Sequence, residues 1–306
     1  MSAEAAADTV VTVPEHLEHR VRMPDGRIVA AAEWGDPKGV PLFALHGTPG
    51  GRVSFWQDPT IYARHGLRRI TLDRPGYGES TRQPGRIVAD AVPDIAAIAD
   101  QLGIGSFAVT GGSGGGPHAL AVATLLPDRV LRCLADVSIA PYPAEGLDWF
   151  AGQTRGNVDE FQAAQRGEAD IRQLTEAEWA GLRARLDAGD SNFLGDNYEM
   201  SEADQAQMLK HLGRMAINLR AALAGGVDGW VDDDIAFTKP WGFDVGDITG
   251  TIMLSYGRVD TLVPAAHGDW LAAHIPGVTT RVLEEAGHMG DDADVEHDMA
   301  WLAGQG

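Results

Sequence analysis

The chain has 306 residues, which is enough for one large domain or for one domain that carries an inserted subdomain. Hydrophobic residues make up 44% of the sequence and charged residues 22%, a balance that excludes a disordered protein. The 24 Lys and Arg residues against 44 Asp and Glu residues give a formal net charge of −20. A surface this acidic repels phosphate groups, so we expect neither nucleic acid nor a membrane as a partner.

The sequence has no feature typical of an exported or membrane-spanning protein. No apolar run reaches the roughly 18 residues needed to cross a bilayer. The segment from Met1 to Val13 has neither the basic cluster nor the apolar stretch of a signal peptide. The single cysteine, Cys133, permits no internal disulfide and no cysteine-based zinc site. These observations predict a cytoplasmic protein.

Short apolar runs alternate with helical patterns, which predicts an α/β fold with a mostly parallel central sheet covered by helices on both faces. In chain order, the predicted elements are strands 17–23, 28–34, 41–45 and 67–72, helix 87–102, strand 107–110, helix 117–126, strand 130–137, strand 251–256, helix 267–275, strand 279–283 and helix 295–302.

Between residues 141 and 245 the strand patterns stop and signals for helix starts take their place. Thr175 with Glu178, and Ser201 with Asp204, match the spacing of a capping box. The predicted organisation is therefore a core made of residues 1–140 and 246–306, with a helical lid inserted at 141–245.

The segment from Gly111 to Gly116 reads Gly-Gly-Ser-Gly-Gly-Gly and lies between a predicted strand and a predicted helix. A G-x-S-x-G sequence in this context is typical of a nucleophile elbow, in which glycines make room for a sharp turn around the serine. Ser113 is therefore the candidate nucleophile. A Walker motif, which would favour phosphate binding, is missing.

A serine hydroxyl needs a base to become a useful nucleophile. Of the 10 histidines, His288 follows the last predicted strand and precedes the last helix, so its loop should open at the same sheet edge as Ser113. We expect His46 to be structural and His118 to point away from Ser113. The remaining histidines are expected to be mostly solvated; they are His16, His19, His65, His211, His267, His274 and His297.

The histidine needs a carboxylate that orients it. Asp260 lies just past predicted strand 251–256 and is favoured, while Asp136, at the end of the preceding strand, is the competitor. The N–H groups of Gly114 and Thr48 are the candidate oxyanion hole, since Pro49 has no N–H group to donate.

Together these motifs resemble the α/β-hydrolase fold superfamily, in its serine-nucleophile branch of esterases and proline iminopeptidases. The resemblance rests on the segments 46–50, 73–80 and 111–115, on Asp260 with 262–264, and on 287–288. It covers the chain from about Leu17 to the end, with the lid as the unmatched part, and it implies the fold and the catalytic order Ser, Asp, His. Branches with an aspartate nucleophile do not fit Ser113. Proline iminopeptidases usually carry a Trp after the serine and Arg-Gly in the second motif, where this chain has Gly114 and Arg74-Pro75.

Two other features of the insertion have open or minor interpretations. Its aromatic residues either line an apolar substrate pocket or pack the lid on the core; they are Trp149, Phe150, Trp179, Phe193, Trp230, Trp241 and Phe243. The run Asp232-Asp233-Asp234 is interpreted as a solvated acidic turn rather than a metal site.

The sequence as a whole predicts a serine hydrolase that cleaves a small carboxylic ester through an acyl-enzyme, with a small-molecule substrate and no cofactor or metal. The alternatives are a proline iminopeptidase-like aminopeptidase, a C–C hydrolase or perhydrolase with the same triad, and a slow-turnover ligand sensor. The oligomeric state is left open.

Overall fold

The computed structural model describes residues 11–54, 59–190 and 192–305. Eight strands form one sheet in the order β1-β2-β4-β3-β5-β6-β7-β8. β1 and β2 pair antiparallel, β2 is antiparallel to β4, and every later pair is parallel. The strands are β1 (Leu17–Arg22), β2 (Ile28–Gly35), β3 (Val40–Leu45), β4 (Leu67–Leu72), β5 (Phe107–Gly112), β6 (Val130–Asp136), β7 (Ile252–Gly257) and β8 (Thr279–Leu283).

Helices cover both faces of this sheet because successive residues of its central strands point to opposite sides. Phe43 and Val109 pack toward α2 (Ala91–Gln101), α3 (Gly116–Leu125) and α8 (Ala265–His274). Their neighbours Leu42 and Ala108 pack on the other face toward α1 (Thr60–Arg64) and α9 (Asp292–Leu302). The predicted mostly parallel α/β sheet is confirmed.

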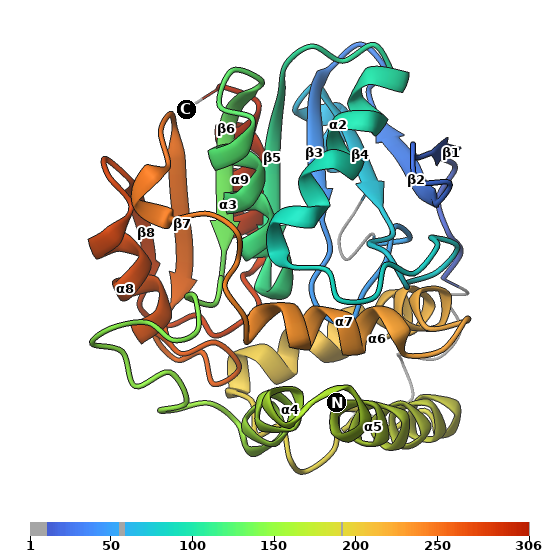
Figure 1. Ribbon diagram of the computed structural model, residues 1–306, viewed down its shortest axis with the longest axis vertical. Coiled ribbons are helices and arrows are strands. Elements are labelled where there is room, and N and C mark those ends of the chain that lie inside the picture. Colours follow the sequence, from blue (N-terminus) through green and yellow to red (C-terminus); the bar gives the residue numbers. More distant parts are fainter. Residues whose placement is uncertain (1–10, 55–58, 191, 306) are drawn as a thin grey trace, which may run out of the picture.

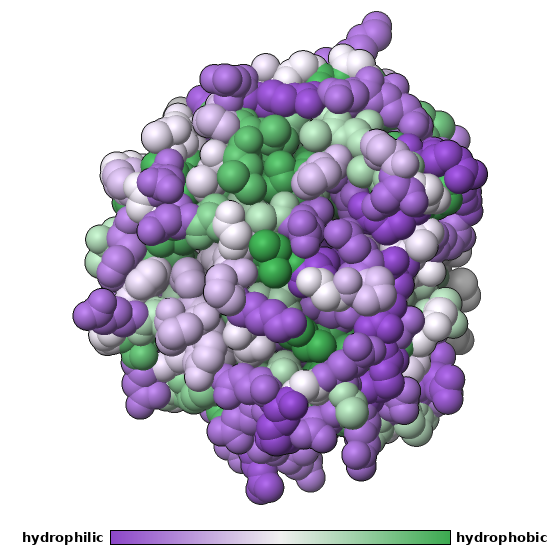
Figure 2. All heavy atoms as spheres, in the orientation of Figure 1, coloured by the Kyte–Doolittle hydropathy of each residue, from purple (hydrophilic) through white to green (hydrophobic). Residues whose placement is uncertain are grey.

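In the described part of the chain between β6 and β7 there are four α-helices: α4 (Arg155–Arg166), α5 (Glu168–Ala188), α6 (Glu202–Ala222) and α7 (Asp228–Phe237). They gather at one end of the sheet, with α7 running directly beneath the strands (Figure 1). In the same view, most of the surface over these helices is hydrophilic, and the larger hydrophobic area lies nearer the opposite end of the molecule (Figure 2). The exact boundaries 141–245 stay a prediction.

One of the two predicted helix starts is confirmed and the other is wrong. Ser201 caps α6, and its hydroxyl accepts a hydrogen bond from the Asp204 N–H. Thr175, by contrast, lies inside α5, where its hydroxyl donates 2.9 Å to the Ile171 carbonyl. The chain turns at Gly167, whose φ of 129° favours glycine, and α5 begins at the next residue.

No helix among the described residues is both long enough and apolar enough to cross a membrane.

Candidate active site

Ser113 stands at the junction of β5 and α3, as predicted. Its φ is 55°, in the left-handed region that residues other than glycine rarely adopt. Side chains at positions 111 and 115 would collide with the backbone at Gly115 and at Leu45, respectively. The glycines on either side therefore allow the sharp turn that presents the serine at the end of β5.

His288 and Asp260 come from the loops that follow β8 and β7, and they form a hydrogen-bonded pair. His288 Nδ1 lies 2.8 Å from Asp260 Oδ2. The other oxygen, Oδ1, accepts the backbone N–H groups of Leu262 at 2.8 Å and Val263 at 2.9 Å. Burial alone would lower the pKa of His288, but the charge and the hydrogen bond of Asp260, together with the charges of other nearby carboxylates, raise this pKa.

The competitor Asp136 lies at the end of β6 and does not pair with the imidazole. Burial is the main cause that raises its pKa to about 6, against a hydrogen bond from Ser255. His288 is thus hydrogen-bonded to Asp260, the carboxylate that the sequence favours over Asp136.

Ser113 and His288 both line a cavity of about 210 Å³ between the sheet edge and the inserted helices. Within the described ranges, the side-chain hydrogen bond of His288 goes to Asp260 and none joins it to Ser113. A serine–histidine contact that closes only around substrate is common in unliganded enzymes.

Thr48 and Gly114 line the same cavity from two loops. Residue 114 must be small, because a Cβ there would collide with the Thr48 side chain and lie 3.1 Å from the ring of Phe237. The candidate oxyanion donors are therefore packed directly against each other.

The prediction for Asp232, Asp233 and Asp234 is wrong: these residues form part of α7 and are buried. Apolar residues precede and follow this run in the sequence, so α7 packs against the protein on several faces. Its three acidic side chains are buried as a consequence. Asp233 is fully buried between the guanidinium groups of Arg74 and Arg86, at 2.5 Å and 2.7 Å. No cluster able to hold a metal ion occurs among the described residues.

Two histidines that the sequence predicts as solvated are buried, His267 and His211. His267 is buried rather than solvated, and its ring contacts the Ala140 N–H at 3.1 Å and the Trp149 carbonyl at 3.0 Å. His118 is buried behind the elbow, where Nδ1 donates 2.9 Å to the Gly114 carbonyl. His46 is structural, as predicted: its Nε2 accepts the Arg74 N–H at 3.2 Å.

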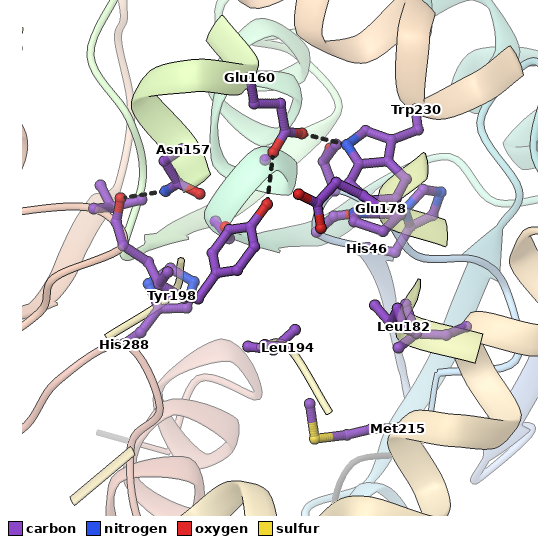
Figure 3. Close-up of a pocket in the computed structure, with 18 of the residues that line it drawn as sticks. His46, Asn157, Glu160, Glu178, Leu182, Leu194, Tyr198, Met215, Trp230 and His288 are labelled. Carbon is purple, nitrogen blue, oxygen red and sulfur yellow. Dashed lines mark hydrogen bonds between the residues drawn. The ribbon is translucent and has the colours of Figure 1, made fainter. Parts of the chain in front are cut away.

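Three acidic residues of the inserted helices line the cavity, and the sequence analysis missed all of them: Glu160, Glu178 and Asp234. Figure 3 shows Glu160 and Glu178 near one another, between Tyr198 and Trp230, both of which donate to Glu160. Asp234 is buried, and its carboxyl group forms a hydrogen bond with that of Glu160.

The three carboxyl groups have pKa values above their usual range, because burial disfavours their charged forms. For Asp234 the neighbouring charge of Glu160 adds to this effect. In the described ranges, no arginine or lysine forms an ion pair with any of the three. Among the described residues that line the cavity, this acidic wall has no arginine or lysine beside it.

The aromatic residues of the insertion divide between the two interpretations. Phe193 and Trp230 line the cavity, together with Phe161 and Phe237. Trp149 and Trp241 belong instead to the main hydrophobic core.

A family model described as alpha/beta hydrolase fold matches residues 40–290. A non-heme chloroperoxidase from Streptomyces lividans is 28% identical over 142 residues, 46% of this chain and 51% of that protein. A proline iminopeptidase from Neisseria gonorrhoeae is 35% identical over 105 residues, 32% of each chain. The chain thus matches about half or less of the length of these curated relatives.

Solved structures resemble the protein over nearly its whole length. The esterase RhEst1 from Rhodococcus sp. ECU1013 is 16% identical, with a TM-score of 0.66 over 94% of this chain and 99% of that chain. A thermophilic esterase from Thermogutta terrifontis is 19% identical, with a TM-score of 0.64 over 95% and 99%. At these identities the similarity concerns the fold. With the family model matching most of its length, the chain belongs to the alpha/beta hydrolase fold family.

Proposed function

We propose that the protein is a serine hydrolase that cleaves a small carboxylic ester through an acyl-enzyme. The observation that carries this proposal is the 2.8 Å pair of His288 Nδ1 and Asp260 Oδ2 on a cavity that Ser113 also lines. An imidazole held through Nδ1 leaves Nε2 available to a hydroxyl group. The sharp turn at Ser113 is the usual setting of an exposed nucleophile in this fold.

In the proposed reaction, the Ser113 oxygen attacks the ester carbonyl while His288 Nε2 takes the hydroxyl proton. The N–H groups of Thr48 and Gly114 stabilise the negative carbonyl oxygen of the tetrahedral intermediate. His288 then gives its proton to the departing alcohol, which leaves an acyl group on Ser113. Water attacks this ester with His288 as base, and collapse of the second intermediate releases the acid and restores the serine.

The test is turnover of a panel of esters, lactones and aminoacyl amides by wild type and Ser113→Ala. Ser106→Ala is the control, because Ser106 is exposed and does not line the cavity. We expect Ser113→Ala to lose several orders of magnitude in kcat while staying folded, and to lose labelling by a fluorophosphonate. Near wild-type turnover by Ser113→Ala would refute the proposal. Labelling of the wild type without turnover of any panel member would favour the slow ligand sensor.

A second candidate is an aminopeptidase of the proline iminopeptidase type, and the acidic wall of the cavity favours it. Glu160, Glu178 and Asp234 could hold the ammonium group of an N-terminal residue while Ser113 attacks its carbonyl carbon. Faster turnover of a prolyl amide than of a matched neutral ester, with a KM for the amide that rises at least about tenfold in Glu178→Gln, would favour this candidate. Addition of hydrogen peroxide, or of a β-diketone substrate, to the panel tests the perhydrolase and C–C hydrolase alternatives.

A further inference from the structure

Asp233 of α7 is the centre of a buried polar cluster that joins the inserted helices to the loop after β3. Its Oδ2 accepts the Thr48 hydroxyl at 2.7 Å and the Tyr77 hydroxyl at 2.9 Å. Arg74 and Arg86 complete its ion pairs at 2.5 Å and 2.7 Å. Asp233 is fully buried, so these contacts are shielded from water.

Arg74 extends the same cluster to the backbone on the N-terminal side of Thr48. Its guanidinium group donates to the His46 carbonyl, to the Gly47 carbonyl at 3.1 Å and to the Thr48 hydroxyl at 3.1 Å. The Thr48 hydroxyl therefore donates to Asp233 and accepts from Arg74. With both its donor and its acceptor positions occupied, the side chain holds one orientation, and the backbone of residues 46–48 is fixed beside it.

Burial alone would raise the pKa of Asp233, but the charges of Arg74 and Arg86 outweigh it and hold the pKa well below its usual range. The two ion pairs thus favour the charged form of Asp233. A buried ion pair of this kind adds little net stability compared with apolar residues of the same volume, since its desolvation is costly. Apolar residues could match the stability that this ion pair contributes, but they could not form the directional hydrogen bonds that hold its partners in place.

The cluster ends at Thr48 and Gly114, the two candidate oxyanion residues, which both line the cavity. Gly114 packs against the Thr48 side chain and the Phe237 ring of α7, and its carbonyl is held by His118. His118 is neutral at physiological pH, because burial lowers its pKa to about 3. One donor residue is thus held from α7 through Asp233, and the other from α3 through His118.

We propose that Asp233 is a positioning residue for the oxyanion hole: by fixing Thr48, it aims the Thr48 N–H at the carbonyl oxygen of the substrate. This inference rests on the proposed function and adds that the inserted helices, besides covering the cavity, complete the catalytic machinery of the core. Asp233 contacts no substrate. Its contribution is exerted entirely through Thr48.

The decisive comparison is between two variants of Thr48 itself. Thr48→Ser keeps the hydroxyl that Asp233 and Arg74 bind, whereas Thr48→Val keeps the shape and the backbone N–H but removes the hydroxyl. Removing one oxyanion donor costs about 10²–10³ in kcat. We therefore expect Thr48→Val to lose about 30- to 300-fold in kcat with KM within about threefold, and Thr48→Ser to keep a kcat at least about tenfold above that of Thr48→Val.

Asp233→Asn is expected to show the same selective loss of kcat, when turnover is expressed per active site titrated to completion with a fluorophosphonate. The matched control is Asp232→Asn. Asp232 lies on the same helix as Asp233 and forms a 2.8 Å ion pair with Arg82, whereas the Thr48 hydroxyl binds Asp233. We expect Asp232→Asn to keep wild-type kcat per titrated site, even if its melting temperature falls.

These outcomes separate the two proposals. If Ser113→Ala stays active, the proposed function is wrong. If Ser113→Ala is inactive but Thr48→Val matches Thr48→Ser in kcat, Asp233 does not position the oxyanion hole. Equal kcat losses in Asp233→Asn and Asp232→Asn would also overturn the inference. Should Asp233→Asn fail to fold, because it leaves two buried guanidinium groups underpaired, the Thr48 pair still decides.

Discussion

His288 and Asp260 are joined by a 2.8 Å hydrogen bond, and the second oxygen of Asp260 is held by two N–H groups of its own loop. The loop therefore holds the carboxylate in place independently of its hydrogen bond to the imidazole. This arrangement determines which tautomer of His288 is present: a proton on Nδ1 faces Asp260, and Nε2 is left as the acceptor.

Asp260→Asn should reduce kcat/KM by about 10³–10⁴-fold, because the amide cannot hold the same tautomer or stabilise the imidazolium. In the wild type, the acidic limb of the kcat/KM profile should lie above pH 6.5, since the charge of Asp260 raises the pKa of His288. In the variant this limb should move to lower pH. The control is Asp136→Asn, for which we expect less than about a tenfold loss. A larger loss in Asp136→Asn than in Asp260→Asn would exchange the roles of the two carboxylates.

Gly114→Ala should impair catalysis although alanine suits a helix start. The added methyl group would collide with the Thr48 side chain, and the two candidate oxyanion donors would have to separate. We expect kcat to fall by about 10²-fold, measured with an activated ester. Gly105→Ala is the control, because a Cβ at residue 105 meets nothing within 4 Å. Full activity of Gly114→Ala would show that this contact does not matter.

Asp234→Asn should raise the melting temperature at pH 8 by a few degrees and change it little at pH 5. Burial raises the pKa of Asp234 well above its usual value, so the folded state keeps a proton that the unfolded state has already lost. This difference in pKa lowers the free energy of unfolding as pH rises from the pKa of the unfolded state toward that of the folded state. An asparagine side chain does not titrate, so Asp234→Asn removes this loss of stability. Thermal unfolding across this pH range tests the prediction, and a shift of the same size at both pH values would contradict it.

Asp204→Ala should affect both α6 and the loop of His288. Asp204 is in the first turn of α6, and its Oδ1 accepts the Met289 N–H at 2.7 Å. Loss of this bond frees the residue next to His288, so we expect kcat to fall by about tenfold alongside a stability loss of about 1 kcal/mol. Thr154→Ala is the matched control, because it removes the N-cap of α4 at similar cost without contacting this loop. If both variants keep wild-type kcat per folded molecule, Asp204 has only a structural role.

The order of strands and helices in the core could be predicted from the sequence, because strand and helix periods are local properties of the chain. The predicted strand 67–72 and strand 279–283 have the same bounds as β4 and β8. Ser113 could be located in the same way, since a tight turn leaves its mark in the neighbouring glycines. The helix start predicted at Thr175 was wrong. A capping pattern does not show whether the helix has already begun earlier in the chain, as α5 does after the turn at Gly167.

The sequence by itself determined the fold, the candidate nucleophile and the loops from which a base and a carboxylate could come, since each depends on residues close together in the chain. Only the tertiary structure decided that Asp260 rather than Asp136 pairs with His288, and that Asp233 reaches Thr48 across 185 positions. It also placed Glu160, Glu178 and Asp234 on one cavity wall. Charged residues such as these are usually exposed, so composition alone places them in water. Whether they are buried depends on which helix packs over them, and that is a property of the folded chain as a whole.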